Sequence, residues 1–151
     1  MGAYILRFGV NGTTVDVEIS LAPVRRAAEG ESEIRMHLDV VASTPCGLGA
    51  GACVRVAGWA LDPQAGIGAG IESVHVWAVG PTGTPVLVGE ATLGVDRPDV
   101  GASFGAAFGK AGFELRSSVA LAPGRYDVTA YVWNQRTSRW EDARTASLFV
   151  R

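Results

Sequence analysis

The 151-residue chain is poor in charged residues and has no excess of either sign. Asp, Glu, Lys and Arg make up 19% of it, and 13 basic residues against 15 acidic ones leave a net charge of −2. Binding to nucleic acid needs a basic patch, so we expect no nucleic-acid partner. No apolar run approaches the ~20 residues of a transmembrane helix, and residues 1–20 lack the basic start and apolar block of a signal peptide. We therefore expect no membrane insertion and see no export signal.

Residues suited to catalysis or metal binding are scarce as well. The chain has two histidines, His37 and His75, and two cysteines, and it contains no HExxH, zinc-ribbon or P-loop motif. Residues 101–105 fit the GxSxG pattern, but Ser103 lacks the preceding strand, the following helix and the downstream histidine of a hydrolase nucleophile. The sequence therefore predicts a protein that is not an enzyme and that uses neither a cofactor nor a metal.

Glycine is abundant, and its distribution indicates the fold class. Twenty glycines and seven prolines separate short runs rich in valine, threonine and aromatic residues, which is typical of many strands joined by tight turns. A chain of this length buries ~70% of its unfolded surface in one core. We expect a single all-β domain over residues 1–151.

The N-terminal residues predict a hairpin. Residues 4–10 and 13–19 flank Asn11-Gly12, the strongest short signal for a type I′ turn. Pairing across this turn brings six apolar residues to one face: Tyr4, Leu6, Phe8, Val15, Val17 and Ile19. Residues 34–40 alternate as a third strand. Three strands within residues 1–44 are too few to be stable alone, so they must pack on the rest of the chain or on a partner.

Several different short motifs are spread over residues 54–126. They are Gly58-Trp59-Ala60-Leu61-Asp62, Val74-His75-Val76-Trp77-Ala78, Val86-Leu87-Val88-Gly89, Arg97-Pro98-Asp99-Val100, Phe104-Gly105, Ala111-Gly112-Phe113 and Leu121-Ala122-Pro123-Gly124-Arg125-Tyr126. Together they resemble a non-catalytic Ig-like module that recurs in bacterial secreted and cell-surface proteins. The resemblance implies an antiparallel Ig-like β-sandwich of about nine strands, with the module in residues 53–151 and the strands of residues 1–44 extending or covering it. A jelly roll is the alternative fold.

Three local features of the module can be predicted. Asp96 as N-cap and a proline in the first turn indicate a one-turn helix near residues 96–104, which the following glycines keep short. Gly58 interrupts an alternating strand and indicates a bulge or a close approach of another backbone. Tyr126 resembles the tyrosine of the Ig tyrosine corner, whose hydroxyl bonds upstream backbone.

Cys46 and Cys53 flank a loop of small residues. The extracellular setting that the resemblance implies favours a disulfide between them over two free thiols.

The resemblance also predicts an aromatic face. In Ig-type sandwiches the strands at residues 73–79, 126–133 and 143–150 would be neighbours in one sheet. If Val74 and Val76 point inward, one outer face carries His75, Trp77, Tyr131, Trp133 and Phe149. Either the N-terminal hairpin covers this face, or it is a platform for sugar rings or for a neighbouring subunit.

The resulting functional hypothesis is a structural or interaction module of a bacterial extracellular or surface assembly. Its partners would be other protein subunits, in a homo-oligomer or a larger assembly. The alternatives are a carbohydrate-binding module, and a structural subunit of a virion or filament.

Overall fold

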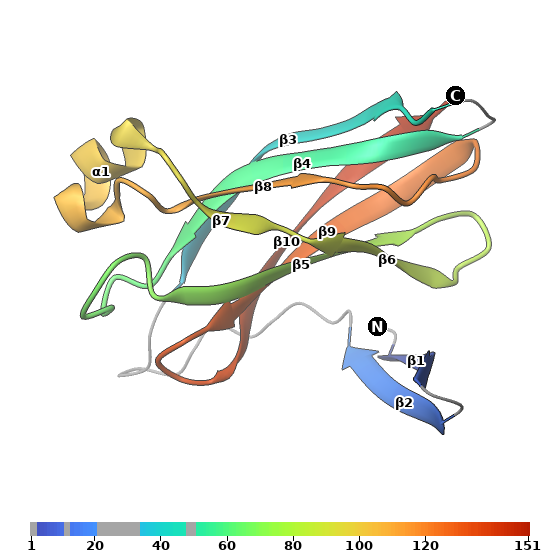
Figure 1. Ribbon diagram of the computed structural model, residues 1–151, viewed down its shortest axis with the longest axis horizontal. Helices are drawn as coiled ribbons and strands as arrows, with labels where there is room; N and C mark the ends of the chain where they lie inside the picture. The colour runs from blue at the N-terminus through green and yellow to red at the C-terminus, as the bar shows by residue number, and fades with distance from the viewer. Residues whose placement is uncertain (1–2, 11–12, 21–33, 48–50) are drawn as a thin grey trace.

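The computed structural model describes residues 3–10, 13–20, 34–47 and 51–151 (Figure 1). The elements in chain order are β1 (Ala3–Val10), β2 (Thr13–Ser20), β3 (Arg35–Pro45), β4 (Ala52–Leu61), β5 (Ile71–Val79), β6 (Pro85–Glu90), β7 (Thr92–Val95), α1 (Pro98–Phe104), the 3₁₀ turn η1 (Ala106–Phe108), β8 (Gly112–Arg116), β9 (Gly124–Asn134) and β10 (Arg139–Val150). The all-β class predicted from the sequence is confirmed.

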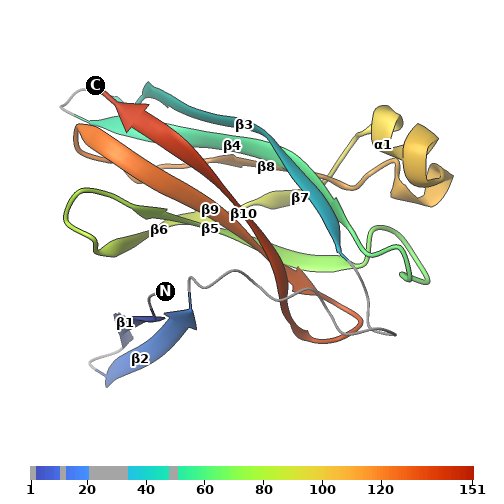
Figure 2. The same cartoon turned by 180° about the vertical axis from the view of Figure 1, so that it is seen from behind.

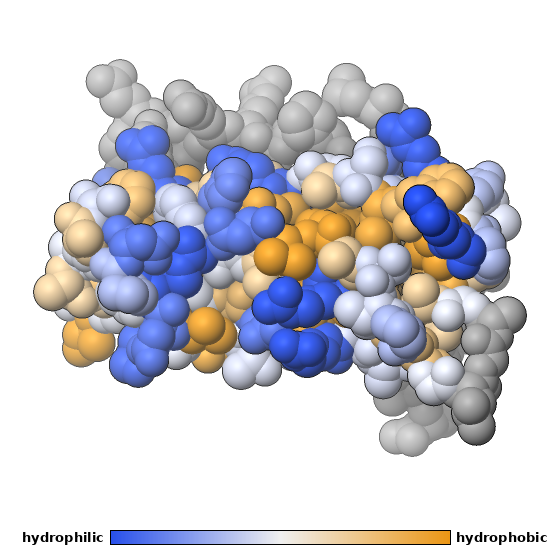
Figure 3. Space-filling model, turned by 90° about the horizontal axis from the view of Figure 1, so that it is seen from above, coloured by the Kyte–Doolittle hydropathy of each residue, from blue (hydrophilic) through white to orange (hydrophobic). Residues whose placement is uncertain are grey.

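Eight of these strands form two four-stranded antiparallel sheets that pack face to face. One sheet has the order β3-β4-β8-β7, and the other has the order β10-β9-β5-β6. The edge strands β3 and β10 lie beside each other, so the two sheets meet along one side (Figure 2). Seen from that side, apolar residues show between polar ones over the middle of the molecule (Figure 3). The result is the β-sandwich that the alternating strands predict.

The core lies between the sheets and consists mostly of small β-branched residues. Val54 and Val56 from β4 face Val74 and Val76 from β5, and all four are fully buried. Because side chains alternate along a strand, every second residue of β4, β5 and β9 reaches this layer. Val74 and Val76 therefore point inward, which is the condition on which the aromatic face depends.

Gly58 lies where β3 comes closest to β4. A Cβ atom at this position would overlap the His37 carbonyl oxygen and would lie 3.0 Å from the Phe113 ring. The register of the β3–β4 pair shifts opposite it, between Leu38 and Val40. The predicted close backbone approach at Gly58 is confirmed.

Residues 85–93 are divided between the two sheets. β6 pairs with β5, whereas β7 pairs with β8. Between them Gly89 has φ 153°, which other residues rarely adopt, and the Ala91 N–H donates to the Val74 carbonyl (2.8 Å). The chain crosses from one sheet to the other at this point.

The N-terminal hairpin forms with the predicted register. Tyr4 pairs with Ile19, Leu6 with Val17 and Phe8 with Val15. The turn Asn11-Gly12 itself lies outside the described residues. β1 and β2 make a two-stranded sheet of their own, whereas β3 pairs along its length with β4.

The short helix lies against the outer face of the sheet that contains β4. α1 has seven residues, about two turns, and begins after Arg97 instead of Asp96. Trp59 stacks on Phe104 with ring centroids 5.4 Å apart, and Leu61 packs with Val100 from α1 in a small second core.

Arg97 joins this helix to β3. Its guanidinium donates to both carboxylate oxygens of Asp99 (2.9 and 2.7 Å) and to Asp39 on β3. The hydrogen bonds from Arg97 lower the pKa of Asp99 from 3.8 to about 2. Arg97 and Asp99 thus hold the start of α1 in place.

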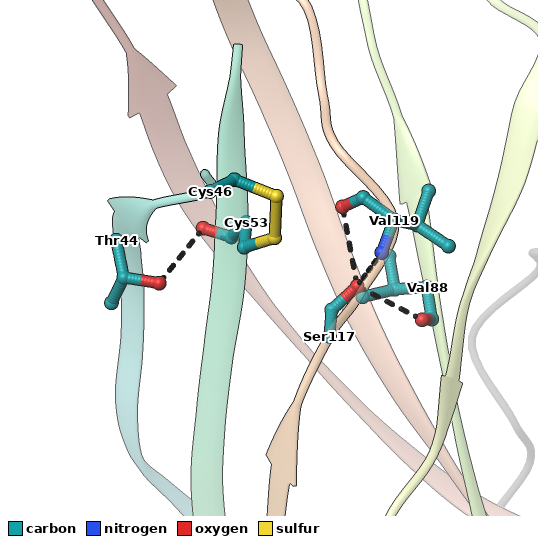
Figure 4. The surroundings of a disulfide bond; sticks show 6 residues. All are labelled: Thr44, Cys46, Cys53, Val88, Ser117 and Val119. Carbon is teal, nitrogen blue, oxygen red and sulfur yellow. Dashed lines mark hydrogen bonds between the residues drawn. A yellow bond between two sulfur atoms is a disulfide. The ribbon is translucent and has the colours of Figure 1, made fainter. Parts of the chain in front are cut away.

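Two further local contacts stabilise the end of the sandwich opposite α1. Cys46 and Cys53 form the predicted disulfide, with Cα atoms 5.0 Å apart (Figure 4). Beside it the Ser117 hydroxyl donates to the Val88 carbonyl (3.1 Å) and so joins the end of β8 to β6 in the other sheet.

Candidate functional site

The candidate site lies on the outer face of the sheet β10-β9-β5-β6. β9 lies between β10 and β5, as the strand order inferred from the sequence requires. His75 on β5 pairs with Tyr131 on β9, and Ser73 pairs with Trp133. Since Val74 between them faces the core, His75, Tyr131 and Trp133 share the outer face.

The aromatic residues of this face differ in exposure. Trp77 and Tyr131 are 6% and 8% exposed, so they contribute packing more than contact surface. The His75 side chain is 33% exposed, and Trp133 is half-buried.

The structure adds Trp140 to the aromatic residues of this face. β10 begins at Arg139, and Trp140 pairs with Trp133 across the β9–β10 ladder. The two indole centroids are 5.1 Å apart with their planes at 81°. The Trp140 ring is also 4.8 Å from the His75 ring. His75, Trp133 and Trp140 together are called the aromatic cluster below.

Phe149 lies at the other end of the same face. It pairs with Arg125, six residues along β9 from Tyr131, and it is 65% exposed. Polar residues separate it from the aromatic cluster: the hydroxyl oxygens of Thr129 and Thr145 lie 2.7 Å apart in this band. The structure therefore does not bring Phe149 into the cluster.

An exposed carboxylate borders the aromatic cluster. Glu90 on β6 pairs with His75 on β5, and its side chain is 61% exposed. The Ser73 hydroxyl donates to one Glu90 oxygen (3.2 Å), and the other lies 3.9 Å from His75 Nε2. The border thus holds a hydrogen-bond acceptor next to aromatic rings.

A buried polar network sets the position of Trp140. Asn134 Nδ2 donates to Glu141 Oε2 (2.7 Å) and to Asp62 Oδ2 (3.1 Å). Asn134 and Asp62 are fully buried, and the Glu141 side chain is 4% exposed. Glu141 is the extra residue of a β-bulge between Trp140 and Asp142, so its bond to Asn134 fixes the strand just after Trp140.

Arginines balance the buried carboxylates of this network. Arg136 Nε donates to Asp62 (3.0 Å), and Arg139 Nε donates to Glu141 (3.1 Å). Asp62 also accepts the Gln64 N–H (2.9 Å), a turn-forming bond typical of aspartate. No pattern in the sequence predicts this network.

The other candidates from the sequence lie apart. Ser103 is an exposed residue near the end of α1, on the outer side of the opposite sheet from His75. In the part of the chain that the structure describes, no three His, Cys, Asp or Glu residues are grouped to hold a metal. Within those same residues, no helix is long and apolar enough to cross a membrane.

The tyrosine of the predicted corner is in place. Tyr126 begins the buried part of β9, and its hydroxyl donates to the Ala122 carbonyl (2.8 Å), four residues upstream. The Tyr126 ring packs under Gly80, where a Cβ atom would meet it.

Comparisons of this chain with protein-family models, with curated proteins and with solved structures found no match.

Proposed function

We propose that the protein is a non-catalytic Ig-like module that joins subunits of a bacterial extracellular or surface assembly. The strand order supports the Ig-like interpretation over a jelly roll. If β3 to β10 are named A, B, C, C′, D, E, F and G, the sheets have the orders A-B-E-D and G-F-C-C′, which is an Ig-type arrangement. The hydrogen bond of Tyr126 to Ala122 is the contact of a tyrosine corner.

The disulfide supports the proposed location. Structural disulfides persist in oxidising compartments and are rare in the cytosol, and Cys46–Cys53 is such a bond. Labelling of intact cells with an antibody to the protein tests a cell-surface location. Its recovery only in virus particles would favour the virion alternative.

The observation that carries the assembly role is the separate N-terminal hairpin. Among the residues that the structure describes, β1 and β2 form a sheet hydrogen-bonded to neither four-stranded sheet, and a lone two-stranded hairpin is at best marginally stable in water. Its register brings Tyr4, Leu6 and Phe8 to one face, which needs a covering surface. A neighbouring copy supplies that surface in the proposed assembly, as in other exchanges of strands between subunits.

Deletion of residues 1–20 tests this role. We expect the parent to be multimeric by light scattering and the truncated chain to be monomeric, with a melting temperature within a few degrees of the parent's. Phe8→Ser should have the same effect as the deletion. Arg7→Ser is the matched control, because Arg7 pairs with Asp16 on the other face of the hairpin, and it should remain multimeric.

A monomeric parent would contradict the assembly role. If the truncation of that monomer also lowered the melting temperature steeply, the hairpin would belong to the fold of its own chain.

The aromatic cluster favours carbohydrate binding as a second candidate function, because it combines partly exposed rings with a carboxylate.

A further inference from the structure

We propose that the aromatic cluster, with Glu90 and Ser73 at its border, is a binding site for a sugar ring. The site lies on β5, β6, β9 and β10 and contains no residue of the hairpin. It therefore goes beyond the assembly role, and either proposal can fail without the other.

The rings supply the apolar half of such a site. One face of a pyranose ring presents C–H groups, which pack against the face of an indole and not against its edge. Trp140 is 41% exposed, and its T-shaped contact with Trp133 and its tilted contact with His75 hold the ring in one orientation. A ring fixed in this way offers contact area at low entropy cost.

Glu90 supplies the polar half. A sugar ring that stacks on an aromatic residue points its hydroxyl groups sideways, where they donate to acceptors at the border of the site. A carboxylate accepts such O–H groups in short, charge-assisted hydrogen bonds. Glu90 is held by Ser73 (3.2 Å) and is 61% exposed, so its remaining acceptor positions are open to a ligand.

The size of the cluster favours a sugar over a protein partner. A stable protein interface buries roughly 800 Å² on each side, whereas this cluster consists of three rings at one end of the sheet. The polar band of Thr129 and Thr145 ends it before Phe149. A small group of rings beside one acid is suited to a ligand of one or two sugar rings rather than to a protein surface.

The test measures sugar binding by the full chain and four variants. Native electrophoresis in gels cast with soluble β-glucan, xylan or amylose, together with a printed glycan array, serves as the probe. We expect the parent to be retarded by at least one of these polysaccharides. Trp140→Ala should weaken binding at least about tenfold, and Trp140→Tyr, which keeps an aromatic ring, should restore most of it.

Glu90→Ala should weaken binding without lowering the melting temperature, because the side chain is largely exposed. Phe149→Ala is the matched control: it removes an exposed ring from the same sheet face outside the cluster, and it should bind like the parent. If Phe149→Ala bound sugar as weakly as Trp140→Ala, the site would extend along the whole face of the sheet.

Two results would overturn the proposal. The first is a parent that binds none of the polysaccharides or printed glycans. The second is a parent that binds one of them while Trp140→Ala and Glu90→Ala both bind it as well as the parent. If the parent bound no sugar but the Trp140→Ala variant had a different mass in solution from the parent, the cluster would be a protein interface instead.

Discussion

Replacement of Asn134 by alanine tests the buried polar network. The Asn134 amide donates to two carboxylates, at 2.7 Å to Glu141 and 3.1 Å to Asp62, and its oxygen accepts the Arg136 N–H at 2.8 Å. Hydrogen bonds to charged groups contribute ~1.5–3 kcal/mol each. Alanine removes two of them and leaves both carboxylates buried with fewer donors.

The arginines still balance part of this charge, so we expect a loss of ~3–5 kcal/mol in the free energy of unfolding. In a domain of this size that loss corresponds to a fall of roughly 6–20 °C in melting temperature. Urea unfolding followed by tryptophan fluorescence measures it, because Trp140 and Trp133 lie next to the network.

Gln135→Ala is the matched control for this measurement. Gln135 is the next residue in the chain, is exposed and bonds through its backbone N–H to Gly70, which alanine preserves. It should change stability by no more than ~0.5 kcal/mol. If Asn134→Ala unfolded at the same urea concentration as Gln135→Ala, the assignment of the network as a stabilising unit would be refuted.

Three further changes have expected outcomes. Cys53→Ser opens the disulfide loop and should lower the free energy of unfolding by ~2.5 kcal/mol, whereas the parent should show no thiol to an alkylating reagent before reduction. Asp99→Asn should lower the melting temperature above pH 4, and its effect should shrink as pH falls toward 2 and vanish below it: the Arg97 hydrogen bonds lower the Asp99 pKa from 3.8 to about 2, so the contribution of the pair declines below 3.8 and is lost as pH falls through the folded-state pKa. Gly58→Ala should lower the free energy of unfolding by at least ~2 kcal/mol, because the added Cβ would overlap the His37 backbone. Gly66→Ala is the control and should change it little, because a Cβ at Gly66 meets nothing within 4 Å. A similar loss of stability in both variants would contradict the role of Gly58.

The features that could be predicted from the sequence are those specified by neighbouring residues. The Asn11-Gly12 signal and the flanking alternation were enough for the hairpin register, and the pairing of Phe8 with Val15 agrees. Val74 and Val76 were assigned to the core because each alternates with a residue of the outer face. The placement of β9 between β5 and β10 needed the Ig resemblance, since no local pattern decides which strands become neighbours.

Features that depend on contacts across the molecule were not predicted. The division of residues 85–93 follows from the conformation of Gly89 and the bond of Ala91 to Val74. The side-chain pattern of this segment contains no sign that its two ends pair in different sheets. The helix begins after Arg97, whose side chain reaches Asp39 on β3, a residue 58 positions away, whereas the capping pattern depends only on the residues around Asp96.

Trp140 shows why the candidate site itself was only partly predictable. A side chain's face follows from counting residues along its strand, and the count fails wherever a bulge adds a residue. Counting back from Ala143, which pairs with Tyr131 on the outer face, assigns position 140 to the inner face. The bulge at Glu141 reverses that parity and turns Trp140 outward to Trp133. The extra residue, Glu141, accepts a hydrogen bond from the buried Asn134 amide, so the bulge that turns Trp140 into the aromatic cluster also places a carboxylate in the buried polar network.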